Sequence, residues 1–201
     1  MIAVLDYGMG NLRSVLNALE SLEVEAFLAD SPDAVGDADR LILPGVGAFG
    51  DGMRNLRDRG FVEAMLDLVA GGRPLLGICL GMQLLATVSE EHGEHEGLGL
   101  IPGAVRRLET SRALRVPHVG WNAVLPRRAS VLLGDGDAEQ TFYFVHSYHL
   151  IPDDPDTVTG VAQYGIDVTA VVERDHVMGA QFHPEKSQRD GLALLGRFLA
   201  C

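Results

Sequence analysis

The sequence predicts an α/β fold in which a mostly parallel central sheet, flanked by helices, carries an antiparallel extension in its second half. Through the first half of the chain, short apolar runs alternate with amphipathic stretches, which is typical of parallel strands joined by crossover helices. Through the second half, short strand-like runs follow one another with turn residues between them, which is typical of hairpins. No linker-like stretch interrupts the 201 residues, so we expect one domain over 1–201.

The elements of the first half have local causes. Met1–Leu5 is an uninterrupted apolar run, as expected of a strand buried on both faces. Segment 11–22 repeats apolar residues at the spacing of one helix face, and the helix expected over 61–69 precedes Gly71 and Gly72, which commonly end a helix. The expected elements are strands over 1–5, 24–28, 41–43 and 74–78, and helices over 11–22, 61–69 and 80–88.

The second half is expected to add short strands and to end in a helix. Its runs are rich in β-branched and aromatic residues, and segment 187–199 has apolar residues at helical spacing. The expected strands cover 104–108, 123–125, 141–145, 158–162, 170–173 and 177–182.

Composition and charge exclude several classes of protein. The formal net charge of −12 argues against binding to nucleic acid or to an anionic membrane. The two cysteines, Cys79 and Cys201, form no disulfide framework, which indicates a reducing compartment. The N-terminus lacks the basic region of a signal peptide and no run of 18 apolar residues occurs, so we expect a cytoplasmic protein.

Two segments partly match a dinucleotide-binding motif and a metal-binding motif, but each lacks residues that the motif requires. The loop at 6–11, DYGMGN, follows a strand as a dinucleotide fingerprint does, but Arg13 stands where the third glycine would be. The segment 90–97, EEHGEHEG, lacks a helical pair of histidines and has no cysteine, so we expect a solvated acidic loop.

Cys79 lies between the strand expected over 74–78 and the helix expected over 80–88. It has a glycine two residues to either side, Gly77 and Gly81. The same spacing around serine makes a nucleophile elbow, a strand–turn–helix bend at which only small neighbours fit. The bend would also place the sulfur at a helix N-terminus, which favours a thiolate. A cysteine buried in an apolar core is the alternative interpretation.

Two further segments provide the remaining parts of an acyl-transfer site. Pro184 disfavours helical geometry at His183, and in an extended chain His183 and Glu185 would point to the same side, as a base and its orienting carboxylate. Pro44-Gly45-Val46-Gly47 follows the strand at 41–43, and its backbone N–H groups at Val46 and Gly47 could form an oxyanion hole with the N–H of Leu80.

These motifs resemble the class I, or triad, glutamine amidotransferases, over the chain from Met1 to the closing helix. The resemblance rests on Gly77–Gln83, His183–Glu185 and Pro44–Gly47. Three further segments resemble one branch of that family, whose members supply ammonia to a cyclase in histidine biosynthesis. These segments are DYGMGN at 6–11, PHVGWN at 117–122 and YFVHSY at 143–148.

The resemblance implies a doubly wound domain that hydrolyses glutamine through a thioester, with no cofactor and no metal. Cys79 would be the nucleophile, His183 the general base and acid, and Glu185 the orienting carboxylate. The glutamine would be held by Gly47, Gln83, His146, Ser147 and Tyr148.

The resemblance also implies a heterodimer with a (β/α)8-barrel cyclase subunit that receives the ammonia. A shielded transfer fits the chemistry, because ammonia at neutral pH is mostly ammonium, which is not a nucleophile. The glycines of the 44–47 loop could hold its N–H groups toward or away from the site, so we expect the partner to favour the active orientation. The contact face is expected to carry Asn11, Trp121, Tyr143 and Lys186.

Three other classes of protein remain as alternatives. The glutaminase subunit of pyridoxal phosphate synthase is similar in size, but its elbow has a small residue after the cysteine, unlike Leu80. A flavodoxin-like cysteine hydrolase would not be expected to have His183-Pro184-Glu185 so near the C-terminus. A non-catalytic binding module would tolerate loss of the triad, and no triad residue is missing.

Overall fold

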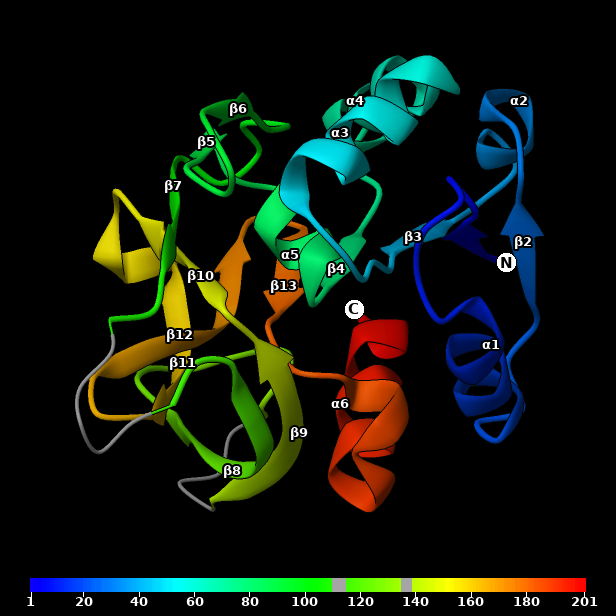
Figure 1. The fold of residues 1–201 in the computed structure, drawn as a ribbon. Helices are drawn as coiled ribbons and strands as arrows, with labels where there is room; N and C mark the ends of the chain where they lie inside the picture. The colour runs from blue at the N-terminus through cyan, green and yellow to red at the C-terminus, as the bar shows by residue number, and fades with distance from the viewer. Residues whose placement is uncertain (110–114, 135–138) are drawn as a thin grey trace.

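A nine-stranded sheet runs through the molecule in the order β2-β1-β3-β4-β13-β12-β11-β8-β9 (Figure 1). The computed structural model describes residues 1–109, 115–134 and 139–201. From β2 to β13 the strands are parallel, and from β13 to β9 they are antiparallel. The strands are β1 (Ile2–Leu5), β2 (Ala26–Ala29), β3 (Arg40–Leu43), β4 (Leu75–Ile78), β8 (His118–Pro126), β9 (Gln140–His146), β11 (Val158–Gln163), β12 (Asp167–Arg174) and β13 (Val177–Ala180).

Helices cover both faces of the parallel half, which confirms the predicted doubly wound fold. Two helices, α1 (Leu12–Glu20) and α6 (Gln188–Ala200), pack on one face. The other face carries α2 (Pro32–Val35), α3 (Phe49–Asp58), α4 (Phe61–Ala70) and α5 (Leu80–Leu84). None of the helices in the described residues is long and apolar enough to cross a membrane.

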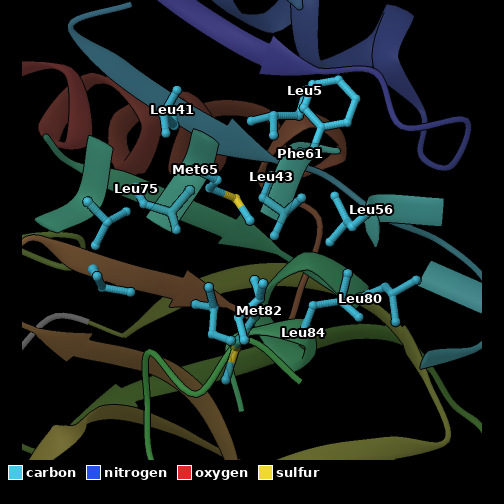
Figure 2. Packing of buried hydrophobic residues seen from close by; sticks show 14 of the residues in the cluster. Leu5, Leu41, Leu43, Leu56, Phe61, Met65, Leu75, Leu80, Met82 and Leu84 are labelled. Atoms are coloured by element: carbon cyan, nitrogen blue, oxygen red, sulfur yellow. The ribbon is translucent and has the colours of Figure 1, made fainter. Parts of the chain in front are cut away.

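The core has two layers because successive strand residues point to opposite faces. On β1, Ala3 and Leu5 belong to the layer under α3, α4 and α5, whereas Ile2 and Val4 belong to the layer under α1 and α6. Figure 2 shows part of the first layer, in which Leu5, Leu41 and Leu43 from strands lie near Leu56, Phe61 and Met65 from helices.

A second, four-stranded sheet lies beside the first (Figure 1), and the strand expected over 104–108 is the one member of it that the sequence predicted. Its order is β10-β7-β5-β6, from β10 (Tyr148–Pro152), β7 (Gly103–Arg107), β5 (Val88–Ser89) and β6 (His95–Glu96). The strands β5 and β6 have only two residues each and form through pairing with distant chain, so no local pattern marks them.

Two helices differ from their predicted extents. The helix expected over 80–88 ends at Leu84, because the carbonyls of Leu84 and Leu85 accept hydrogen bonds from Leu98 and Ile101, each 2.9 Å long. Helix α3 is not evident from the sequence, since it contains two glycines. One of these, Gly52, packs against α5, where a Cβ would lie 3.2 Å from the Leu84 side chain.

Candidate active site

The three predicted site segments follow neighbouring parallel strands. Pro44–Gly47 follows β3, Cys79 follows β4 and His183 comes shortly after β13, and the sheet order places β3, β4 and β13 side by side. The carboxyl ends of parallel strands lie at one edge of a sheet, where α/β proteins bind their ligands. A hydrogen bond of 2.8 Å from the N–H of Cys79 to the carbonyl of Ala180 joins two of these ends.

Cys79 has the strained backbone of a nucleophile elbow, with φ 55° and ψ −109°. Residues other than glycine rarely adopt such a positive φ, and strained positions of this kind cluster at functional sites. The flanking glycines permit the bend. A Cβ on Gly77 would lie 2.7 Å from backbone atoms of Gly81, and one on Gly81 would lie 1.8 Å from the carbonyl oxygen of Leu43.

His183 and Glu185 are in contact, with Nδ1 of the imidazole 2.8 Å from Oε1 of the carboxylate, and both side chains are 2% exposed. Their predicted geometry was wrong in one respect. The chain after His183 does not continue extended but forms a 3-10 turn, η2 (Pro184–Lys186), which folds Glu185 back onto the imidazole. The carboxylate can accept only from an N–H, so the proton at Nδ1 faces Glu185 and Nε2 is left for other partners.

The electrostatics of this pair favour an imidazolium. Burial by itself disfavours the charged ring, but interactions with the Cys79 and Glu185 side chains outweigh burial and raise the pKa of His183 to about 9. Nε2 is buried and, within the described part of the chain, has no hydrogen-bond partner. In the imidazolium this atom carries a proton, which it can donate to the sulfur or to a bound molecule.

A cavity of about 330 Å³ opens at this edge of the sheet, in the size range of small-molecule sites. It brings together all but one of the catalytic, oxyanion-hole and substrate-binding residues expected from the sequence, the exception being Glu185, which lies behind His183. The expected residues that line it are Val46, Gly47, Cys79, Leu80, Gln83, His146, Ser147, Tyr148 and His183.

One predicted oxyanion donor is already engaged. The N–H of Leu80 donates a long hydrogen bond of 3.3 Å to the carbonyl of Gly45. The loop is held at Pro44, whose carbonyl accepts a 2.8 Å hydrogen bond from the buried hydroxyl of Tyr7. A ligand oxygen that uses the Leu80 N–H must therefore displace the Gly45 carbonyl.

Three further residues line the cavity that the sequence did not assign to the site: Glu91, and Pro117 and Val145 from the family-like segments 117–122 and 143–148. Glu91 lies in the segment expected to be a solvated acidic loop, and that expectation was wrong for this residue. Its Oε2 accepts the N–H of Phe49 over 2.7 Å at the start of α3, which turns the carboxylate inward. Within residues 1–109, 115–134 and 139–201, no group of His, Cys, Asp and Glu side chains could hold a metal ion.

The residues expected at a partner interface come from neighbouring elements: η2 packs against both α1 and β9, and β8, which carries Trp121, pairs with β9. Asn11 caps α1, Lys186 is exposed in η2, and Trp121 is 50% exposed on β8. Tyr143 on β9 pairs with Trp121 across the strands, and the two rings meet edge to face at 6.0 Å.

The comparisons with known proteins agree with this geometry. The family model "Glutamine amidotransferase class-I" matches residues 3–200, so the chain belongs to that family. A crystal structure described as a glutamine amidotransferase has the same fold, with a TM-score of 0.78 at 23% identity over 99% of this chain and 97% of the other.

Similarity to curated proteins shows which branch of this family the chain belongs to. "Imidazole glycerol phosphate synthase subunit HisH" of Syntrophotalea carbinolica is 50% identical, with 98% of each chain covered. The HisH subunit of Sulfurimonas denitrificans is 49% identical over 98% of this chain and 97% of its own. At this similarity the chain is a member of the HisH family.

Proposed function

We propose that the chain is the glutaminase subunit of imidazole glycerol phosphate synthase and hydrolyses glutamine to glutamate and ammonia. The observation that carries the proposal is the strained Cys79 in one cavity with His183, whose imidazole is held by Glu185 at 2.8 Å. A nucleophile, a base and an orienting carboxylate are the parts that amide hydrolysis through a covalent intermediate requires.

In the proposed reaction Cys79 acts as a thiolate paired with the imidazolium of His183, whose raised pKa keeps the proton on Nε2, and this thiolate attacks the side-chain amide carbon of glutamine. The imidazolium then protonates the departing nitrogen, so that ammonia leaves and a glutamyl thioester remains. His183 next takes a proton from water, which attacks the thioester and releases glutamate and the thiolate. Glu185 stabilises the imidazolium throughout without taking the proton itself.

Glu91 is suited to bind the α-ammonium group of glutamine. Among the described residues that line the cavity, it is the one with a carboxylate. The hydrogen bond from Phe49 fixes its Oε2 and leaves Oε1 available. An ionic contact between a carboxylate and an ammonium group would orient the amide end of the substrate toward Cys79.

The loop at Pro44–Gly47 supports regulation of the same site. With the Leu80 N–H bonded to Gly45, the oxyanion hole lacks one free donor. A rearrangement that moves the Gly45 carbonyl away would complete the hole, and a glutaminase that wastes little glutamine would make this change when its partner is bound. If the complete hole is about 1% populated alone, activation could reach roughly a hundredfold.

The proposed partner is the (β/α)8-barrel cyclase subunit, which would use the ammonia to make imidazole glycerol phosphate and aminoimidazole carboxamide ribotide in histidine biosynthesis. Apolar side chains on β8 and β9 support docking beside the cavity: Val119 and Trp121 pair with Val145 and Tyr143. Three of these four are more than a third exposed, and a contiguous apolar patch is typical of a protein interface.

The activity is tested by glutamine turnover and ammonia-dependent synthesis in the complex with the cyclase. Cys79→Ala should abolish glutamine hydrolysis but leave synthesis from added ammonium salt intact, because only the thioester step uses this sulfur.

His183→Asn should reduce turnover by about three orders of magnitude or more, and Glu185→Gln by less. Substantial hydrolysis by Cys79→Ala would refute the assignment.

The partner face is tested by the affinity of the complex and by turnover with and without the cyclase. Trp121→Ala should weaken binding by about thirtyfold, as expected of an aromatic anchor in an interface. Ile151→Ala provides the matched control, because Ile151 is also exposed but lies in the second sheet. Equal losses in the two variants, or equal turnover with and without the cyclase, would contradict the proposed face or its regulation.

A further inference from the structure

Gln181 is a buried polar residue that the proposed reaction does not use. It follows β13 directly, is 0% exposed, and its Nε2 lies 3.9 Å from Sγ of Cys79. The two ends of a side-chain amide have nearly the same shape, so the group facing the sulfur has to be determined from the hydrogen-bond network.

The carbonyl of Tyr148 determines the orientation of this amide, because a carbonyl can only accept. Gln83 lies 2.9 Å from that oxygen, so the end of Gln83 that faces it is the NH2 group. The same NH2 group lies 3.1 Å from Gln181, so the end of Gln181 that faces Gln83 must be the oxygen. The NH2 group of Gln181 therefore faces Cys79.

The same carbonyl also determines the tautomer of His146. Nδ1 of His146 is 2.9 Å from the same carbonyl, so it carries the proton, and Nε2 accepts from Nδ1 of His118 at 3.0 Å. Nε2 of His118 is in turn 3.2 Å from the amide nitrogen of Asn122. Burial lowers the pKa of His118 to about 4 and that of His146 to about 3, so both rings are neutral, as this chain of donors requires.

We propose that Gln181 is a thiolate-stabilising residue whose side-chain N–H donates to Sγ of Cys79. The inference rests on the proposed function for its role in catalysis but not for its effect on the sulfur. A hydrogen bond to the charged form favours that form, so the N–H would increase the fraction of thiolate before attack and assist its departure from the thioester. Because the amide itself does not titrate, it can serve both steps without changing its charge.

Within the described residues, other titratable groups also lie near this sulfur, and the amide acts beside them. His183 in the segment after β13 supplies a positive charge, and His146 at the end of β9 is neutral. Tyr7 after β1 is buried, which raises its pKa and keeps the phenol neutral. Glu91 lines the same cavity and would oppose a second negative charge.

The test is the rate of Cys79 alkylation by iodoacetamide as a function of pH, followed by peptide mass analysis in the full-length chain. Gln181→Met keeps the length of the side chain but removes the donor, and it should slow alkylation near neutral pH by about three- to tenfold. At high pH, where the sulfur is fully ionised, the variant should react at least as fast as the unmodified chain, because a thiolate without a hydrogen bond is the stronger nucleophile.

Two controls accompany this variant. The exposed Cys201 in the same molecule should react at an unchanged rate. Gln163→Met, the same change at an exposed glutamine, should leave the rate of Cys79 alkylation unchanged at every pH. If Gln181→Met leaves the pH dependence of Cys79 alkylation unchanged, the proposal is overturned. Slower alkylation at every pH would also overturn it, because that result indicates a disturbed site.

A measurement on the unsubstituted chain covers the case in which Gln181→Met does not fold. The side-chain NH2 resonances of Gln181 should shift over the pH range in which Cys79 becomes reactive, and Cys79→Ala should abolish that shift. Resonances that do not respond to Cys79 would contradict the hydrogen bond. Neither experiment uses glutamine, so a failure of the proposed glutaminase activity would appear separately, as turnover that survives Cys79→Ala.

Discussion

At the scale of single residues, the site depends on two positions that have no side chain. Gly77 and Gly81 let the chain reverse around Cys79, and Gly81 also lies against the end of β3. The contact with the Leu43 carbonyl would be 1.8 Å for a Cβ, far inside the contact distance of any pair of atoms. The same glycine thus permits the elbow and brings the oxyanion loop, which follows Leu43, close to the nucleophile.

Gly81→Ala should therefore lower the free energy of unfolding by about 2 kcal/mol or more, because the backbone of β3 or of α5 must move. Gly196→Ala is the matched control. A Cβ on this glycine of α6 meets nothing within 4 Å, and alanine should raise stability by about 0.5–1 kcal/mol. Urea unfolding of both variants measures the difference. Equal free energies of unfolding for the two variants would mean that the backbone around Gly81 can accommodate a Cβ, contrary to this prediction.

At the scale of elements, β9 and η2 connect the proposed interface to the base. The N–H of His183 donates to the carbonyl of Tyr143 over 2.9 Å. Buried Ser187 joins the same elements, since its hydroxyl donates to the carbonyl of His183 over 2.6 Å and accepts the N–H of Tyr143 at 3.0 Å. A displacement of β9 by a docked partner would reach the imidazole through these three hydrogen bonds.

Ser187→Ala leaves the N–H of Tyr143 without its partner and should cost about 1–3 kcal/mol of stability. It should also lower the kcat of glutamine hydrolysis by about tenfold with little change in KM, because the imidazole is less well positioned. Ser130→Ala tests the alternative of general loosening. Ser130 makes the same kind of link, to Glu173 and Leu133 outside the site, and its loss should reduce stability without changing kcat. Equal effects on kcat would exclude a positioning role for Ser187.

At the scale of the whole molecule, four histidines give the stability an optimum in pH. Burial lowers the pKa of His118 to about 4, of His146 to about 3 and of His149 to about 4, whereas that of His183 is raised to about 9. Below an unfolded pKa of about 6.5, the unfolded chain binds three protons that the folded chain does not, so acid destabilises the fold. Between about 6.5 and 9 only the folded chain holds the proton on His183, so alkali destabilises it as well.

The free energy of unfolding should therefore peak near pH 7, where the four imidazoles of the unfolded chain together hold about one proton, as they do in the folded chain. Below this pH, the three histidines with lowered pKa should decrease the free energy of unfolding by up to about 4 kcal/mol per pH unit. Above it, His183 should decrease the free energy of unfolding by about 1.4 kcal/mol per pH unit. Urea unfolding at a series of pH values measures both slopes. His149→Gln should reduce the acid slope by about one proton and leave the alkaline slope unchanged. A stability that still rises between pH 7 and 9 would contradict the raised pKa of His183.

Most of the parallel half and the parts of the triad could be predicted from the sequence, because their signals are local. Apolar runs and helical spacing identified β1, β3, β4, α1 and α4 with small shifts at their ends. The elbow was evident from Gly77, Cys79 and Gly81, since the constraint on each position comes from its immediate neighbours in the chain. The family and its function followed from these motifs, and the comparisons confirm both.

Long-range pairing decided the rest. The register of β4 between β3 and β13 brings together three segments that are about 30 to 140 residues apart in the sequence, and nothing within any of these segments encodes that separation. The same holds for the second sheet, for Glu91 turned inward by the start of α3, and for Gln181, whose orientation depends on a carbonyl of β10. The sequence by itself determined which local turns and chemical groups this protein has. Only the tertiary structure decided which of those groups meet, because each such contact joins segments that local propensities cannot relate to one another.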